Sequence, residues 1–257
     1  MDLVVICLTA FAASILTFFS GFGLGTLLTP VFIVFFPVEA AIALTGVVHF
    51  FNNIFKLLLT ARTADRTVLL RFGVPAVIAA FAGSMLLLQI THLNPLFSYQ
   101  AFGNTIEVYP VKFIVAVLLI IFASMDLLPY FKKLEFGRDK LPLGGMMSGF
   151  FGGLSGNQGA MRSAFLIRAG LSKEAFVGTT VVVSTFVDFT RLSVYFSNLS
   201  LSGMGENKMI ILAATLSAIT GAFIGNKLLK KVTLGFVQKT VAVMLLLLAV
   251  ALGAGWV

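Results

Sequence analysis

Polar residues gather in two Gly-rich stretches of an otherwise apolar chain. The stretch "GGLSGNQGAMRSAFLIR", residues 152–168, holds hydroxyl, amide and guanidinium side chains within eight positions, and "SGFGLG", residues 20–25, holds a second serine. Such groups donate hydrogen bonds, so together they can bind an anion. The residues that we predict to bind a substrate are Ser20, Gly21, Gly23, Gly25, Ser155, Gly156, Asn157, Gln158, Gly159 and Arg162.

Two apolar segments, 40–60 and 174–196, each carry a polar stripe at three-, four- and seven-residue spacings, which places each stripe on one helix face. The predicted pathway or coupling residues are Thr45, His49, Asn53, Lys56, Thr180, Ser184, Asp188 and Arg191. His49 can titrate near neutral pH, and Asp188 is a conceivable proton carrier, so proton coupling stays open. Alternatively, the stripes join helices by hydrogen bonds, Asp188 pairs with Arg191, and Lys56 and Arg191 reach the membrane surface.

The composition indicates an all-α integral membrane protein, because 59% of the 257 residues are hydrophobic and only 11% are charged. A spanning helix needs about 20 mainly apolar residues. The spans that we predict are 40–60, 68–90, 111–131, 174–196, 208–229 and 236–257. Two further regions, 3–37 and 142–170, are broken by the Gly-rich stretches into helical hairpins. Each hairpin crosses the membrane fully or is re-entrant, which gives 8–10 membrane segments.

The lysines and arginines predict the orientation, because basic loops stay in the cytoplasm. Of 18 such residues, 13 lie in four loops: Arg62, Arg66 and Arg71; Lys132, Lys133, Arg138 and Lys140; Arg168 and Lys173; Lys227, Lys230, Lys231 and Lys239. The loops around 37–39, 91–110 and 197–207 lack them and are expected to face outward, as are both termini. The net charge of +8 is therefore mostly topology, and no nucleic-acid partner is expected.

An internal repeat appears when the chain is shifted against itself by 135 residues. Ser20-Gly21 then meets Ser155-Gly156, Thr45 meets Thr180, Asn53 meets Asp188 and Lys56 meets Arg191. The basic loop 61–71 falls on the non-basic 197–207, so we expect repeats 1–136 and 140–257 to have inverted topology. Each repeat would be a Gly-broken hairpin followed by three transmembrane helices. Inverted repeats with broken helices are typical of secondary transporters, whose site lies where the breaks meet.

The breaks themselves can bind an anion if they face a protein-lined cavity, as irregular backbone in a bilayer must. Helices starting near Gly25 and Gly159 would then point their positive ends inward, and Arg162 would add a charge. Other interpretations remain: the glycines allow close helix packing, Ser155 or Asn157 caps a helix, and Arg162 reaches the surface.

The segments "FFSGFGLGTLLTPVF" and "FFGGLSGNQGAMRSAF", each followed by Glu-Ala and a polar helix, resemble the TauE/SafE family of bacterial membrane proteins over essentially the whole chain. The resemblance implies export or permeation of a small anion such as sulfite, a sulfonate or sulfoacetate across the cytoplasmic (inner) membrane. The motifs are degenerate, and Leu27 stands where the second half has Arg162. The substrate, its direction, the coupling ion and homo-oligomer formation stay open.

Rival functions have weaker sequence support. "GLSG" at 153–156 fits the motif of intramembrane serine proteases, but a serine nucleophile needs a positioned base, and both histidines, His49 and His92, precede it. A metal transporter would need clustered ligands, which the membrane region lacks, and Cys7 has no partner cysteine. A membrane subunit without transport activity also remains. We therefore expect no enzyme activity, no cofactor and no metal, with the lipid bilayer and a small anion as partners.

Overall fold

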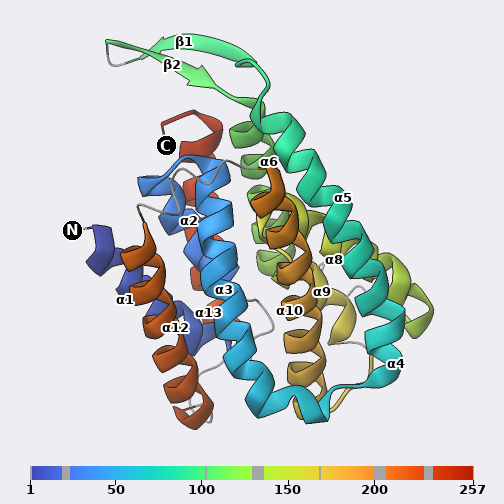
Figure 1. Ribbon diagram of the computed structural model, residues 1–257. Coiled ribbons are helices and arrows are strands. Elements are labelled where there is room, and N and C mark those ends of the chain that lie inside the picture. Colours follow the sequence, from blue (N-terminus) through green and yellow to red (C-terminus); the bar gives the residue numbers. More distant parts are fainter. Residues whose placement is uncertain are drawn as a thin grey trace.

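The computed structural model is a helical bundle (Figure 1) and describes residues 2–18, 24–101, 103–128, 136–167, 169–198, 207–228 and 234–256. Ser20, Gly21 and Gly23 therefore lie outside the described residues. The first half contains α1 (Asp2–Thr17), α2 (Gly25–Phe35), α3 (Val38–Thr60), η1 (Ala61–Thr63), α4 (Arg66–Val68), η2 (Leu69–Gly73), α5 (Val74–Thr91), β1 (Phe97–Ala101), β2 (Asn104–Val108) and α6 (Pro110–Leu127). The second half contains η3 (Arg138–Lys140), α8 (Leu141–Ser155), α9 (Gly159–Leu166), α10 (Lys173–Asn198), α12 (Lys208–Leu228) and α13 (Leu234–Gly253).

Helices lie where the apolar segments predicted them. Within the described residues, helices over Val38–Thr63, Arg66–Thr91, Lys173–Ser197 and Lys208–Lys227 are long and apolar enough to cross a membrane. Helices α6 and α13 begin within a few residues of the other two expected spans. The chain is thus a multi-pass, mainly helical membrane protein, as its composition predicted.

Each of the two predicted hairpins contains two separate helices. Helix α1 ends at Thr17 and α2 begins at Gly25, while α8 ends at Ser155 and α9 begins at Gly159. In the second break, Gly156 has φ +75° and its N–H donates to the carbonyl of Gly152 at 3.0 Å. A left-handed residue after a helix is usually glycine, because a side chain is strained there. The sequence therefore stops α8 at this point.

The hairpins pack against long helices through small residues. Helix α8 lies along α5, and α1 lies along α12. A Cβ on Gly149 or Gly153 would come within 2.2 Å of a carbonyl oxygen of α5, and one on Gly145 would come within 2.2 Å of the carbonyl oxygen of Phe72 in η2. A Cβ on Gly221 would come within 2.4 Å of the carbonyl oxygen of Phe11. Backbones approach this closely only where side chains are absent, which is the usual role of small residues in membrane helices.

Helices α3 and α10 pack against each other between these two pairs, and α6 packs against α13 (Figure 1). Helix α3 also contacts α12, and α10 also contacts α5. The polar stripes of α3 and α10 are therefore enclosed by other helices, and this central pair of helices positions the charged residues.

A β-hairpin was not predicted in the segment treated as an outward loop. Strands β1 and β2 pair antiparallel, with Phe97 opposite Val108 and Ala101 opposite Asn104. The hairpin lies at the end of the bundle opposite α4 (Figure 1), and the Tyr99 hydroxyl donates to the carbonyl of Ala254 at 2.5 Å. It forms because β-branched and aromatic residues are frequent here, and Gly103 at the turn has φ +80°. The protein is thus helical within the membrane and has a small sheet at one end.

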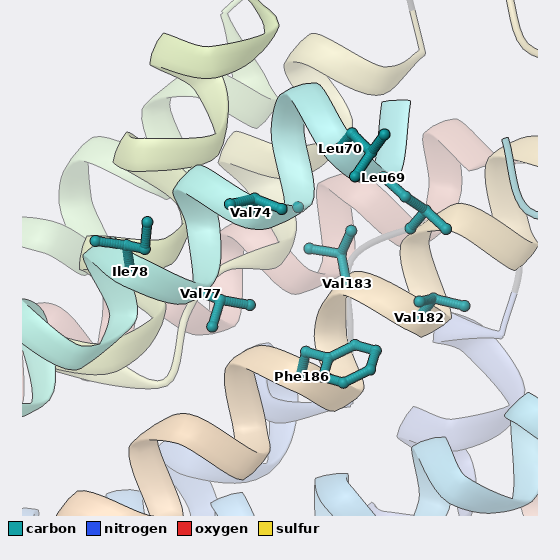
Figure 2. Close-up of a pocket in the computed structure, with 9 residues that line it drawn as sticks. Leu69, Leu70, Val74, Val77, Ile78, Val182, Val183 and Phe186 are labelled. Carbon is teal, nitrogen blue, oxygen red and sulfur yellow. The ribbon is translucent and has the colours of Figure 1, made fainter. Parts of the chain in front are cut away.

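An apolar groove lies between α5 and α10, next to the π-helical turn η2 (Figure 2). It is lined by Leu69, Leu70, Gly73, Val74, Val77, Ile78, Val182, Val183 and Phe186. Leu70 and Ile78 are 69% and 68% exposed, so the groove opens on the outer surface of the bundle. Its lining contains no charged side chain, and it is distinct from the polar centre described next.

Candidate functional site

The charged residues of the two polar stripes are buried inside the bundle. Lys56 is 3% exposed, Arg162 1%, and Asp188 and Arg191 0%. The alternative in which Lys56, Arg162 and Arg191 reach the membrane surface is therefore wrong for this structure. A charge at the centre of a membrane helix costs about 2.5–3.5 kcal/mol on insertion scales, so each buried charge needs compensating contacts.

Asp188 on α10 is the centre of a hydrogen-bonded network that joins three elements. His49 Nδ1 lies 2.6 Å from its Oδ2, and Asn53 Nδ2 donates to the same oxygen at 3.0 Å. Its other oxygen, Oδ1, accepts from Arg191 Nε at 3.0 Å and forms an ion pair with Arg191 Nη2 at 2.9 Å. Gln158 Nε2 donates to Oδ1 from the second break at 3.4 Å. The expected Asp188–Arg191 pair is confirmed, and it is only part of a larger network.

The two helix breaks meet beside this network. A Cβ added to Gly25, the first residue of α2, would lie 3.1 Å from the carbonyl oxygen of Gly156. A Cβ added to Gly156 would lie 2.9 Å from Arg191 Nη1 and 3.4 Å from Thr29 Oγ1. Gly25 and Gly156 were both predicted from the sequence, and the fold brings them into contact with a guanidinium group beside them.

Several buried polar atoms around the breaks have no hydrogen-bond partner within the described residues. They are Thr29 Oγ1, Thr45 Oγ1, both amide atoms of Asn157, Gln158 Oε1 and Arg191 Nη1. An unsatisfied buried group costs about 1–3 kcal/mol, and native proteins contain few of them. A cluster of such atoms at one place is explained if a polar ligand completes their hydrogen bonds.

Arg162 contacts α10 from α9, the return helix of the second hairpin. It lies one turn into α9, and its Nη1 donates to Ser184 Oγ on α10 at 2.5 Å, while Ser184 donates to the carbonyl of Thr180 at 2.8 Å. Neither Leu24 nor Gln158, the N-cap residues of α2 and α9, provides a side-chain cap. The first N–H groups of both helices therefore have no side-chain cap partner, which suits an anion.

The remaining predicted break residues have structural contacts. The Ser155 hydroxyl donates to the carbonyl of Phe151 at 3.0 Å and accepts from the N–H of Asn157 at 3.4 Å. Its proton is thus directed into its own helix, and the Nδ1 of His49 faces the carboxylate of Asp188 instead. Ser155 and His49 do not have the nucleophile–base geometry that a serine hydrolase needs. Gly159 is the first residue of α9.

Lys56 belongs to a second cluster, next to α1 and α12. Its Nζ lies 5.1 Å from the centre of the Phe18 ring. With the Asn52 amide oriented to satisfy its neighbours, the amide oxygen lies 3.2 Å from Lys56 Nζ and the amide nitrogen donates to the carbonyl of Ala218 at 3.2 Å. A cation over an aromatic face is stabilised by the ring quadrupole. Lys56 belongs to the same sequence stripe as His49 and Asn53, but the structure places it with a different set of partners.

Sequence reasoning missed Thr29 and Phe18. Thr29 is a polar residue four positions after Gly25 and so lies one turn above the first break, a signal that could have been found. Phe18 could not have been assigned, because its contact with Lys56 depends on how α1 and α3 pack. Tyr195, which continues the α10 stripe, donates to the carbonyl of Gly153 on α8 and so fixes α10 against the second hairpin.

Apolar helices enclosing a charged centre where two helix breaks meet define a multi-pass membrane protein with an internal polar site. The chain belongs to the sulfite exporter TauE/SafE family, whose family model matches residues 6–252. This family is one of membrane transporters for sulfite or related anions. Neither a curated protein nor a solved structure matches the chain.

Proposed function

We propose that this protein is a secondary transporter that moves a small anion, such as sulfite, a sulfonate or sulfoacetate, across the bacterial inner membrane by alternating access. Family membership supports transport of this class of anion. The proposed substrate site lies between the two breaks, at Gly25, Gly156, Asn157 and Arg191, with Arg162 close by. Export is proposed from the family alone.

One observation carries the proposal: buried donors without partners surround the contact between the two breaks. Arg191 Nη1 and the Asn157 amide have no hydrogen-bond partner within the described residues, and both belong to the rim of the Gly156 turn. An oxyanion can accept from a guanidinium, an amide and helix N-terminal N–H groups at the same time. Within the described residues, three buried cations, Lys56, Arg162 and Arg191, also outnumber the one buried carboxylate, Asp188.

We propose further that residues 1–136 and 140–257 are inverted repeats. The helix contacts support this, because they exchange under a 135-residue shift: α1 packs on α12 as α8 packs on α5, and α3 on α12 as α10 on α5. The pairs α3–α10 and α6–α13 map onto themselves. A two-fold axis between α3 and α10 would let the halves rock about the site. Both termini would then face outward and the basic loops the cytoplasm.

The experiment is uptake of radiolabelled sulfite, methanesulfonate and sulfoacetate into proteoliposomes, with wild-type protein beside Arg162→Ala, Arg191→Ala and the control Arg62→Ala. Arg62 is exposed in η1, so its loss removes the same charge without touching the site. We expect wild type and Arg62→Ala to transport at least one anion. The two site variants should lose at least about a hundredfold in transport efficiency, because a charge-assisted contact with the anion disappears.

The result that contradicts the proposal is equally specific. If no anion moves, the transporter assignment of this chain fails. If sulfite moves and both Arg162→Ala and Arg191→Ala transport as fast as Arg62→Ala while eluting as a single species in detergent, then the site is elsewhere.

A further inference from the structure

Asp188 holds two different kinds of partner on its two oxygens. Oδ2 faces His49 and Asn53 on α3, and Oδ1 faces Arg191 and the Gln158 amide. Arg191 is the group that connects this carboxylate to the proposed anion site, because its Nη1 lies at the Gly156 turn while its Nε and Nη2 lie on Asp188. One guanidinium therefore stands between an internal carboxylate and the place proposed for the substrate anion.

The His49 tautomer follows from these contacts. An ionised carboxylate only accepts hydrogen bonds, so the ring nitrogen 2.6 Å from Asp188 Oδ2, Nδ1, carries a hydrogen. In a neutral ring Nε2 then has the free lone pair. A proton that arrives at Nε2 makes an imidazolium paired directly with Asp188.

The charged groups around His49 determine how favourable its protonation would be. On α3 the other buried titratable group is Lys56; on α10 they are Arg191 and Tyr195; on α9 it is Arg162. Helices α2 and α8 contain no titratable side chain, and Lys208 and Lys227 of α12 are exposed at its ends. Asp188 is thus the one buried carboxylate of the described residues that opposes these cations, and it has Arg191 and His49 as alternative charged partners.

We propose that the anion and a proton bind together: the anion takes over Arg191, and His49 then accepts a proton and becomes the counter-ion of Asp188. This inference rests on the proposed transport function and names its coupling ion. Before binding, Arg191 is paired with Asp188 and His49 is neutral. After binding, the anion is paired with Arg191, and protonated His49 is paired with Asp188.

The charges balance for each monoanion that enters. One negative charge arrives with the anion, and one proton from the water on the open side arrives at Nε2, so no net charge is added to the buried site. No covalent bond other than the N–H bond forms. Because anion binding and proton binding favour each other by linkage, net transport follows the sum of the anion and proton gradients.

The test compares His49→Asn with His92→Asn, the matched change at the chain's second histidine, which is exposed at the end of α5. An asparagine at 49 can still donate to Asp188 but cannot take up a proton. Sulfite uptake into proteoliposomes is measured at several external pH values with a fixed internal pH. Sulfite's own protonation contributes equally to all proteins, so the difference between proteins reports the site.

We expect acidification by one unit to accelerate uptake by wild type and His92→Asn at least about threefold more than uptake by His49→Asn. If wild type transports sulfite and His49→Asn keeps the full pH response, the coupling inference is overturned while the transport function stands. If wild type moves no sulfite under any gradient, both fail.

A second measurement avoids dependence on the folding of His49→Asn. In the His92→Asn protein labelled with ¹⁵N-histidine, His49 gives the only imidazole signals. Adding sulfite at constant pH should shift them from a neutral ring, with one protonated nitrogen, to an imidazolium with two. Unchanged imidazole signals at a sulfite concentration that saturates transport would overturn the inference.

Discussion

Asn53 and Asp188 are 135 residues apart and hydrogen-bonded, with Asn53 Nδ2 3.0 Å from Asp188 Oδ2. This separation equals the shift that aligns the two proposed repeats, so the two residues would occupy equivalent positions on α3 and α10. Residues related by a two-fold axis meet only where that axis passes. The contact therefore marks the point about which the proposed halves would rotate, and the charged network lies there.

Replacing Gly156 should harm transport more than its backbone strain alone explains. Gly156→Ala places a side chain in the left-handed region, which costs about 1 kcal/mol, and puts its Cβ 2.9 Å from Arg191 Nη1. Gly103→Ala is the control, because Gly103 also has positive φ but a Cβ there meets nothing within 4 Å. We expect similar losses of thermal stability but a loss of sulfite uptake only in Gly156→Ala. Equal uptake by the two variants would show that the Gly156 turn is not part of the substrate site.

Asn157→Ala should reduce transport without destabilising the protein. Both amide atoms of the side chain are buried without a hydrogen-bond partner within the described residues. Removing them therefore breaks no hydrogen bond of the described residues, and it removes two buried polar atoms that are unsatisfied. We expect the unfolding temperature to stay unchanged or rise, and transport efficiency to fall about tenfold. Thermal unfolding in detergent and uptake kinetics check this. A clear drop in the unfolding temperature would mean that Asn157 is a structural residue.

Removing the charge of one member of the Asp188–Arg191 pair should destabilise the fold more than removing the charges of both. Asp188→Asn leaves a buried guanidinium without its carboxylate, and Arg191→Gln leaves a buried carboxylate without its guanidinium. Each change should lower the free energy of unfolding by about 3–5 kcal/mol. Asp188→Asn/Arg191→Gln removes both charges, and we expect it to recover at least half of either loss. Unfolding of the three variants in detergent measures the coupling. Additive losses would show that the pair does not stabilise the fold.

The contact between α8 and α5 should tolerate no added methyl group. In Gly149→Ala the new Cβ would lie 1.9 Å from the carbonyl oxygen of Ala76, so the helices must separate, at a cost of more than about 2 kcal/mol. Met146→Ala, on the same helix at a residue that is 47% exposed, should cost less than about 1 kcal/mol. Detergent-solubilised protein of each variant is compared by thermal unfolding. Equal stability would contradict the close packing of the two helices.

The orientation can be tested with single cysteines after Cys7→Ala removes the native thiol. Arg66 and Gln100 are both exposed, and they lie in α4 and β1, at opposite ends of the bundle (Figure 1). A membrane-impermeant maleimide should label Gln100→Cys in intact cells and Arg66→Cys only after permeabilisation, because basic loops stay in the cytoplasm. The reverse labelling pattern would invert the proposed topology.

Much of the helical framework was predictable because hydropathy acts locally. An apolar run of about 20 residues becomes a helix in a bilayer, because its backbone groups must be hydrogen-bonded within the segment. The starts of α3 and α10 fall within two residues of those expected. The β-hairpin at 97–108 was not predicted, because strand formation outside the membrane depends on pairing between segments, which a lack of Lys and Arg does not indicate.

The sequence by itself determined which residues are polar, which helix face they share and where each hairpin breaks. The tertiary structure decided which of them meet: His49 and Asn53 with Asp188, Gly25 with Gly156, and Lys56 with Phe18 instead of Asp188. Helical periodicity fixes the direction of a side chain around its own axis but not the neighbour that it faces. That neighbour depends on how closely glycine-lined backbones approach and on the requirement that every buried charge find a partner.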